Sequence, residues 1–78
     1  MQFCYVYILR SVNRADRHYV GFTDDLRARL TKHNSGSVSH TAKDRPSEIK
    51  TAVAFRDGSS GIAFERYLKT ASGRAFAK

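Results

Sequence analysis

Residues 3–9, Phe-Cys-Tyr-Val-Tyr-Ile-Leu, constrain the fold most strongly because they are apolar on both alternate faces. Neighbouring side chains of a strand point to opposite faces, so a strand that is apolar on both is covered on two sides. Aromatic and β-branched residues favour a strand here. We therefore expect a central strand, and a chain of 78 residues has room for one core around it, hence for a single domain over residues 1–78.

A second strand is expected at residues 18–22, His-Tyr-Val-Gly-Phe. The polar residues 11–17 precede it and include the turn formers Asn13 and Asp16. Two strands joined by a short polar link form a hairpin.

A helix is predicted to begin at residues 23–25, where the Thr23 hydroxyl is expected to cap it and Asp24 and Asp25 to place negative charge in its first turn. Leu26 and Leu30 fall on one face of it, and residues 34–36, Asn-Ser-Gly, end it. The polar residues 37–46 are read as a long loop, and long loops in compact domains are often functional.

Residues 48–56 alternate in the manner of a third strand, and a second helix is expected after residues 57–60, ended by Gly73. The predicted class is α+β: a small, largely antiparallel three-stranded sheet flanked by helices, in the order β-β-α-β-α.

The charge balance points to a polyanionic partner. Fourteen Lys and Arg against seven Asp and Glu give a net charge of +7, and nucleic acid explains this better than solubility does, because added acid is the better route to solubility. Cys4 is the only cysteine, which excludes an intramolecular disulfide and a thiolate metal site, and we expect it in the core. No apolar run approaches the about 20 residues of a membrane helix, so a cytoplasmic protein is expected.

Several short motifs occur in an order that is more specific than any one of them. They are Tyr5-Val6-Tyr7, Tyr19-Val20-Gly21, Leu26 with Arg29 and Leu30, His33-Asn34, and Glu65. In order and spacing they resemble the motifs of GIY-YIG nucleases, and the chain looks most similar to the small stand-alone bacterial members. The resemblance covers nearly the whole chain and implies the GIY-YIG fold.

The resemblance also implies catalytic roles. Tyr7 and Tyr19 would stand side by side with their hydroxyls toward the site, Tyr19 assisting or acting as the base that activates water. Arg29 would stabilise charge on the attacked phosphate, a task that suits an always-ionised guanidinium. His33 would lie near the scissile phosphate and shuttle a proton.

Glu65 matches the single metal-binding carboxylate of the family. One carboxylate with waters and phosphate oxygens suits Mg²⁺, with Mn²⁺ as a possible substitute. Further candidates for contacts with nucleic-acid phosphates are Thr41, Lys43, Arg45 and Lys69. Phe22 stands where repair-type relatives often carry a lysine.

Simpler roles compete with these. Tyr7 and Tyr19 are also ordinary strand aromatics, Arg29 could be a solvated helix charge, and Glu65 could form a surface pair with Lys69 one turn on. Gly21 is read as a point of close backbone approach.

The hypothesis is a Mg²⁺-dependent endonuclease that hydrolyses DNA, structured or damaged, as a monomer or weak dimer, with DNA favoured over RNA. The alternative is a non-catalytic nucleic-acid-binding module that keeps the fold; a protein-protein adaptor is a third possibility.

Overall fold

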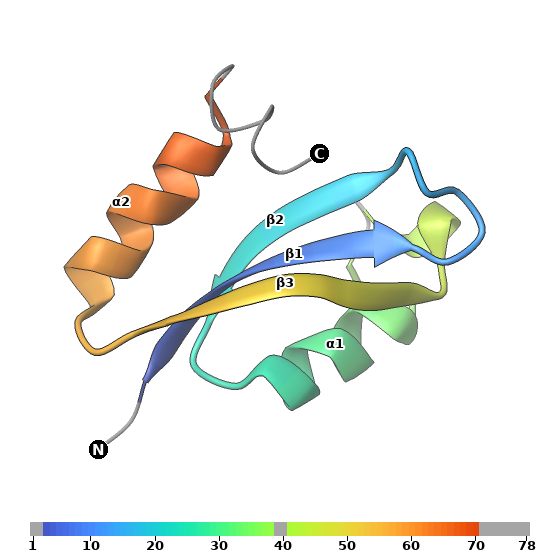
Figure 1. The fold of residues 1–78 in the computed structure, drawn as a ribbon. Helices are drawn as coiled ribbons and strands as arrows, with labels where there is room; N and C mark the ends of the chain where they lie inside the picture. The colour runs from blue at the N-terminus through green and yellow to red at the C-terminus, as the bar shows by residue number, and fades with distance from the viewer. Residues whose placement is uncertain (1–2, 39–40, 71–78) are drawn as a thin grey trace.

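The computed structural model describes residues 3–38 and 41–70, which form three strands and two α-helices (Figure 1). The strands are β1 (Cys4–Ser11), β2 (His18–Thr23) and β3 (Ser47–Phe55), and the helices are α1 (Leu26–Asn34) and α2 (Gly58–Leu68). The expected α+β class and the order β-β-α-β-α are confirmed. The loop before β3 differs from the prediction because it contains one turn of 3-10 helix, Ala42–Asp44.

β1 is the central strand, as its two apolar faces predict. The sheet order is β2-β1-β3, and β1 is antiparallel to both neighbours. The β1–β2 pair is the predicted hairpin, and Ser11 N donates to Arg17 O at 3.1 Å across its link. The middle of β1, Val6 to Leu9, is buried because strands cover its edges and helices its faces.

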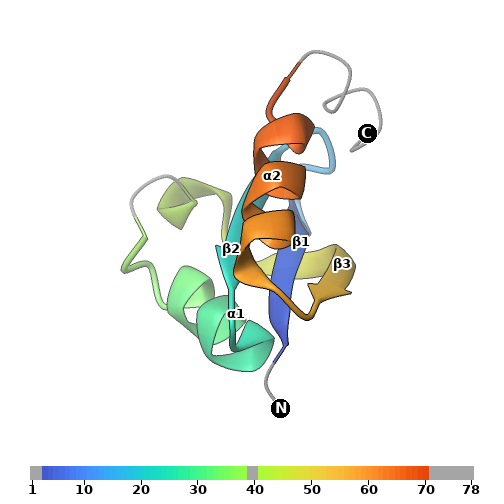
Figure 2. The same cartoon turned by 90° about the vertical axis from the view of Figure 1, so that its left-hand side faces the viewer.

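The two helices lie on opposite sides of this sheet (Figures 1 and 2). Val6 and Ile8 point to one face, where they form the hydrophobic core with Leu68 of α2. Tyr7 points to the other face, where it meets His33 of α1. Alternation along one strand therefore separates an apolar layer from a polar one.

α1 begins close to the predicted place, but its cap is not the expected one. Asp25 is the N-cap, and its carboxylate accepts from Ala28 N at 3.0 Å. The Thr23 hydroxyl instead bonds to the backbone of Asp25, and the first turn of the helix holds no acidic residue. The helix ends at Asn34, and Gly36 then adopts a φ of 86°, a conformation that glycine enters without steric cost.

The predicted end of α2 is wrong. The helix begins after its N-cap Asp57 and ends at Leu68, five residues before Gly73, which lies outside the described residues. Thr70 accounts for the early stop, because its hydroxyl donates to Tyr67 O at 2.6 Å, and its backbone N–H donates to the same oxygen at 3.0 Å. These bonds occupy a carbonyl that a continuing helix would use.

Within residues 3–38 and 41–70, neither helix has the length and apolar character needed to cross a bilayer.

Candidate active site

Tyr7 lies at the centre of the polar face and is 1% exposed. Its cross-strand partner in β2 is Gly21, and a Cβ added there would overlap the Tyr7 ring and hydroxyl. The tyrosine side chain therefore lies directly over the backbone of β2. The reading of Gly21 as a point of close approach is confirmed.

Tyr19 stands beside Tyr7 on the neighbouring strand, as expected. The two ring centroids are 6.5 Å apart, and Tyr19 is only half-buried. Tyr19 is thus the more accessible of the two phenols.

His33, near the end of α1, completes an aromatic cluster with the two tyrosines. Its Nε2 lies 3.1 Å from the Tyr7 hydroxyl, and its ring centroid lies 5.0 Å from that of Tyr19. His33 is 1% exposed. The histidine therefore lies inside the protein, and its expected role near the scissile phosphate stays a prediction.

Burial lowers the pKa of His33, and the positive charges of Arg29 and Lys32 lower it further. The imidazole is therefore neutral at neutral pH, with one nitrogen carrying a proton and the other able to accept one.

Arg29 acts on Tyr7 in opposition to burial. Burial raises the pKa of the Tyr7 phenol, while Arg29 lowers it through its charge and through a side-chain hydrogen bond. The pKa of Tyr7 is nevertheless raised, so the phenol carries its proton at neutral pH. The positive charge of Arg29 alone does not make the Tyr7 phenol a base. Tyr7 needs a partner that accepts its proton.

Glu65, on α2, is the last of the candidate catalytic residues. Its negative charge helps to raise the pKa of Tyr7, which places the carboxylate within electrostatic range of the cluster. Its side chain is 22% exposed and pairs with Lys69 Nζ at 3.4 Å, so the simpler surface pairing is also present. Within the described residues no three His, Cys, Asp or Glu side chains gather as a metal site, so any metal here would depend on Glu65 with waters and substrate oxygens.

The four candidates for phosphate contacts divide into two kinds. Lys43, within the 3-10 turn, and Arg45, just after it, are both exposed, although Arg45 Nε donates to Ala42 O at 2.7 Å. Lys69 is exposed and pairs with Glu65. Thr41 is different, since it is 5% exposed and its hydroxyl lies 2.8 Å from His33 Nδ1.

Asn34 has a role that sequence reasoning did not assign. Its side-chain amide donates to Ser47 O at 3.0 Å and accepts from Ser47 N at 2.7 Å. These two hydrogen bonds fix the end of α1, and with it His33, against the start of β3. The only available signal was its place beside His33 in the family motif.

Phe22 and Cys4 are accounted for without chemistry. Phe22 packs against the apolar core on the α2 side, which explains why no charged group stands there. Cys4 is half-buried and free, so the expectation of a core position is met only in part.

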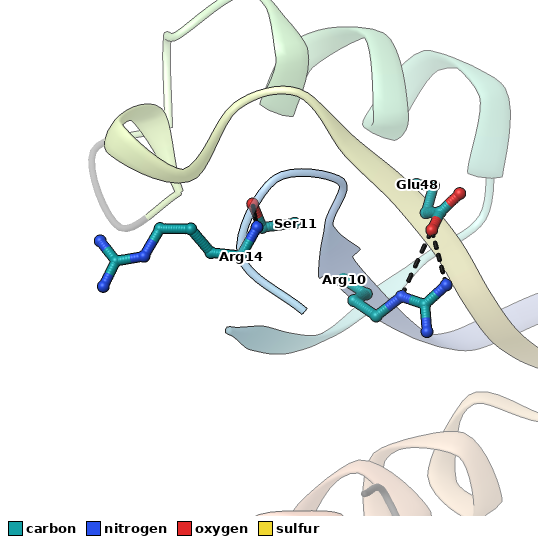
Figure 3. Close-up of polar contacts among 4 residues, drawn as sticks. All are labelled: Arg10, Ser11, Arg14 and Glu48. Atoms are coloured by element: carbon teal, nitrogen blue, oxygen red, sulfur yellow. Dashed lines mark hydrogen bonds and ion pairs between the residues drawn. The ribbon is translucent and has the colours of Figure 1, made fainter. Parts of the chain in front are cut away.

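A second polar cluster lies at the hairpin end of the sheet, away from the aromatic cluster (Figure 3). Arg10 donates to one carboxylate oxygen of Glu48 through Nη2 at 2.8 Å and Nε at 3.3 Å, across the β1–β3 pair. Arg14 N donates to Ser11 Oγ at 3.1 Å, while the Arg14 guanidinium extends away from the strands (Figure 3). Because the Arg10–Glu48 pair is solvated, it contributes little to stability.

The matches to known proteins agree with this geometry. A family model described as "GIY-YIG catalytic domain" matches residues 3–78. A protein of Lacticaseibacillus paracasei named "UPF0213 protein" is 33% identical over 66 residues, which cover 83% of this chain and 72% of the relative. A "UPF0213 protein" of Streptococcus pneumoniae serotype 4 is also 33% identical over 66 residues, covering 83% of this chain and 65% of the relative.

Proposed function

The chain belongs to the GIY-YIG family, whose catalytic domain is of the nuclease type, and from this premise we propose that it is a metal-dependent endonuclease that hydrolyses DNA. The observation that supports the proposal is the aromatic cluster of Tyr7, Tyr19 and His33. Arg29 of α1 and Glu65 of α2 lie within electrostatic range of Tyr7.

Arg29 is proposed to bind the attacked phosphate. Arg29 is half-buried, and its positive charge acts on the Tyr7 phenol, so it combines proximity to the aromatic cluster with partial access to solvent. A permanent positive charge with several N–H donors stabilises the negative charge that builds on phosphate oxygens during hydrolysis.

Water activation is assigned to the aromatic cluster. Tyr19 is the more exposed phenol and orients the attacking water or takes its proton, while the buried Tyr7 connects the site to His33. A neutral imidazole is suited to accept that proton.

Glu65 is proposed to hold a divalent cation. GIY-YIG nucleases generally use divalent metal ions, and a single, partly exposed carboxylate fits Mg²⁺, which keeps most of its waters; Mn²⁺ is a possible substitute. When bound, the ion would supply charge stabilisation at the phosphate. The present pairing of Glu65 with Lys69 is weak enough at 3.4 Å for the carboxylate to exchange partners.

A nucleic-acid partner follows from the domain type, and the net charge of +7 agrees with it. We place phosphate contacts at the exposed Lys43 and Arg45, with Lys69 beside the metal ligand. The substrate is proposed to be structured or damaged DNA rather than RNA. Residues 1–78 are proposed to act as one domain, in the cytoplasm, as a monomer or weak dimer.

The test is a cleavage panel of single-stranded, duplex and branched DNA and RNA with Mg²⁺, Mn²⁺ or a chelator. We expect Glu65→Gln to lose roughly a hundredfold or more in cleavage rate, as an essential electrostatic group does. Glu48→Gln is the matched control, because Glu48 is an exposed glutamate paired with Arg10 outside the aromatic cluster. Cleavage by Glu65→Gln at the rate of the control would overturn the assignment of Glu65.

The second candidate function is a non-catalytic nucleic-acid-binding module. Two observations favour it. The Glu65–Lys69 pair occupies the carboxylate that would bind a metal, and the raised pKa of Tyr7 keeps the phenol protonated. In the same panel, salt-sensitive binding with no cleavage of any substrate would select this function over the first.

A further inference from the structure

Thr41 is buried in the polar layer, although it belongs to the loop before β3. Its hydroxyl oxygen lies 2.8 Å from His33 Nδ1 and 3.4 Å from Val38 O. Because Thr41 is only 5% exposed, its side chain is not placed to contact a phosphate at the protein surface. What Thr41 does contact is the ring nitrogen of His33 opposite the one that meets Tyr7.

A neutral imidazole has one N–H donor and one acceptor nitrogen, so two arrangements of protons are possible. In the first, Nδ1–H donates to Thr41 and Nε2 accepts from the Tyr7 hydroxyl. In the second, Thr41 donates to Nδ1 and Nε2–H donates to the Tyr7 oxygen.

The Tyr7 hydroxyl decides between the two. Among the described residues, the hydrogen-bond partner of this hydroxyl is His33 Nε2. In the second arrangement the Tyr7 oxygen would accept from Nε2–H, and its own O–H would have no acceptor among the described residues. In a phenol that is 1% exposed, an unpaired O–H is costly. The first arrangement pairs every group, including the Thr41 proton, which goes to Val38 O.

We propose that Thr41 is a positioning residue that fixes the tautomer of His33, so that the bare Nε2 faces the Tyr7 hydroxyl. The resulting chain of donors runs from Tyr7 to His33, from His33 to Thr41, and from Thr41 to Val38 O. The hydroxyl of Thr41 acts through His33 and touches no reacting atom.

The catalytic consequence rests on the proposed nuclease function. As the attacking water passes its proton to the Tyr7 oxygen, the Tyr7 proton moves to His33 Nε2. The phenol is thereby restored, and the resulting imidazolium returns its proton to solvent after the product leaves. The water oxygen forms a bond to phosphorus, the bond to the leaving alkoxide breaks, and that alkoxide takes a proton from solvent. The opposite tautomer could not accept the Tyr7 proton.

The direct test is the nitrogen NMR spectrum of the His33 side chain near neutral pH, assigned by its disappearance in His33→Gln. In the wild type and in Thr41→Ser, which keeps the hydroxyl, we expect the proton on Nδ1. In Thr41→Val, which has the same shape without the hydroxyl, we expect a shift toward the Nε2–H form. A wild-type spectrum with the proton on Nε2, or an unchanged tautomer in Thr41→Val, would overturn the proposal.

Cleavage and DNA binding provide the second arm. Thr41→Val should lower the cleavage rate roughly tenfold, the size of one ordinary hydrogen bond, with an unchanged Kd for DNA, and Thr41→Ser should restore the rate. A weakened Kd in Thr41→Val would instead make Thr41 a phosphate contact and contradict the positioning role. If the wild type does not cleave at all, the nuclease function fails, while the NMR result still decides the tautomer.

Discussion

The two faces of the sheet are built from the same strand but solve different problems. On the α2 face, Val6 and Ile8 of β1 pack against Leu68 in an apolar layer that needs only shape. On the α1 face, Tyr7 is equally buried but meets His33 through a hydrogen bond. Alternation along β1 therefore separates the residues that stabilise the fold from those proposed for chemistry, and a mutation can affect one set without the other.

Arg29→Ala should have the largest effect, and it should lower the cleavage rate without disturbing the apolar face. We expect cleavage to fall roughly a hundred- to a thousandfold, because the charge that stabilises the phosphate is lost, while the unfolding midpoint stays close to the wild-type value. Arg27→Ala is the control on the same helix, since Arg27 is exposed. An equal loss in both variants would mean that Arg29 supplies only general positive charge.

Leu68→Ala should strike the apolar face. Removing this 1% exposed side chain leaves a cavity against β1, and we expect a loss of about 2–5 kcal/mol in the free energy of unfolding, measured by urea denaturation. Ile62→Ala, on the same helix but 40% exposed, should stay within about 0.5 kcal/mol. If cleavage per folded molecule also collapsed in Leu68→Ala, the division between the faces would not hold.

Gly21→Ala tests the close approach of Tyr7 to β2. A methyl group at this position meets the Tyr7 ring and hydroxyl, so we expect a loss of about 1–3 kcal/mol and a reduced cleavage rate as Tyr7 is displaced. Gly58→Ala is the control, because a Cβ there has open space and the position begins a helix. Equal stability of the two variants would show that Tyr7 relocates without cost.

Asn34→Ala removes both hydrogen bonds to Ser47. We expect a loss of about 1–2 kcal/mol, the net value of two ordinary hydrogen bonds, measured by thermal or urea unfolding. Thr31→Ala, at an exposed position of the same helix, is the control and should change little. A neutral Asn34→Ala would show that packing alone holds α1 in place.

Acid should have the smallest effect. The folded-state pKa of His33 lies below the ordinary value of 6.5, so between these two values the unfolded chain binds more protons than the folded one. Stability contributed by neutral His33 is therefore complete above pH 6.5 and falls as the pH drops toward the folded pKa. The unfolding midpoint followed from pH 7.5 to 5 should show this decrease, and it should be weaker in His33→Gln. An identical slope in that variant would remove His33 as the cause.

The sequence alone predicted the features that depend on local pattern. The two apolar faces of residues 3–9 predicted a central strand, and the glycine at 21 predicted a close contact. Residues 23–25 predicted the start of α1, although the cap is the Asp25 carboxylate rather than the Thr23 hydroxyl. Tyr7 and Tyr19 came together as the family motif implied.

What the sequence could not predict depends on contacts between distant residues. The burial of Thr41 against His33, and the bond of Asn34 to Ser47, join residues eight and thirteen positions apart through a loop with no periodic pattern. The end of α2 depended on one hydroxyl, that of Thr70, competing for a helix carbonyl.

The Asn34 amide also affects how the edge of the sheet can pair with another chain. β3 is an edge strand, and edge strands present unpaired N–H and C=O groups on which another chain can add. At Ser47 both of these groups are already bonded to the Asn34 side chain. The side chain imitates the peptide group of a further strand, so at its first residue β3 has neither backbone group free to pair with a second copy.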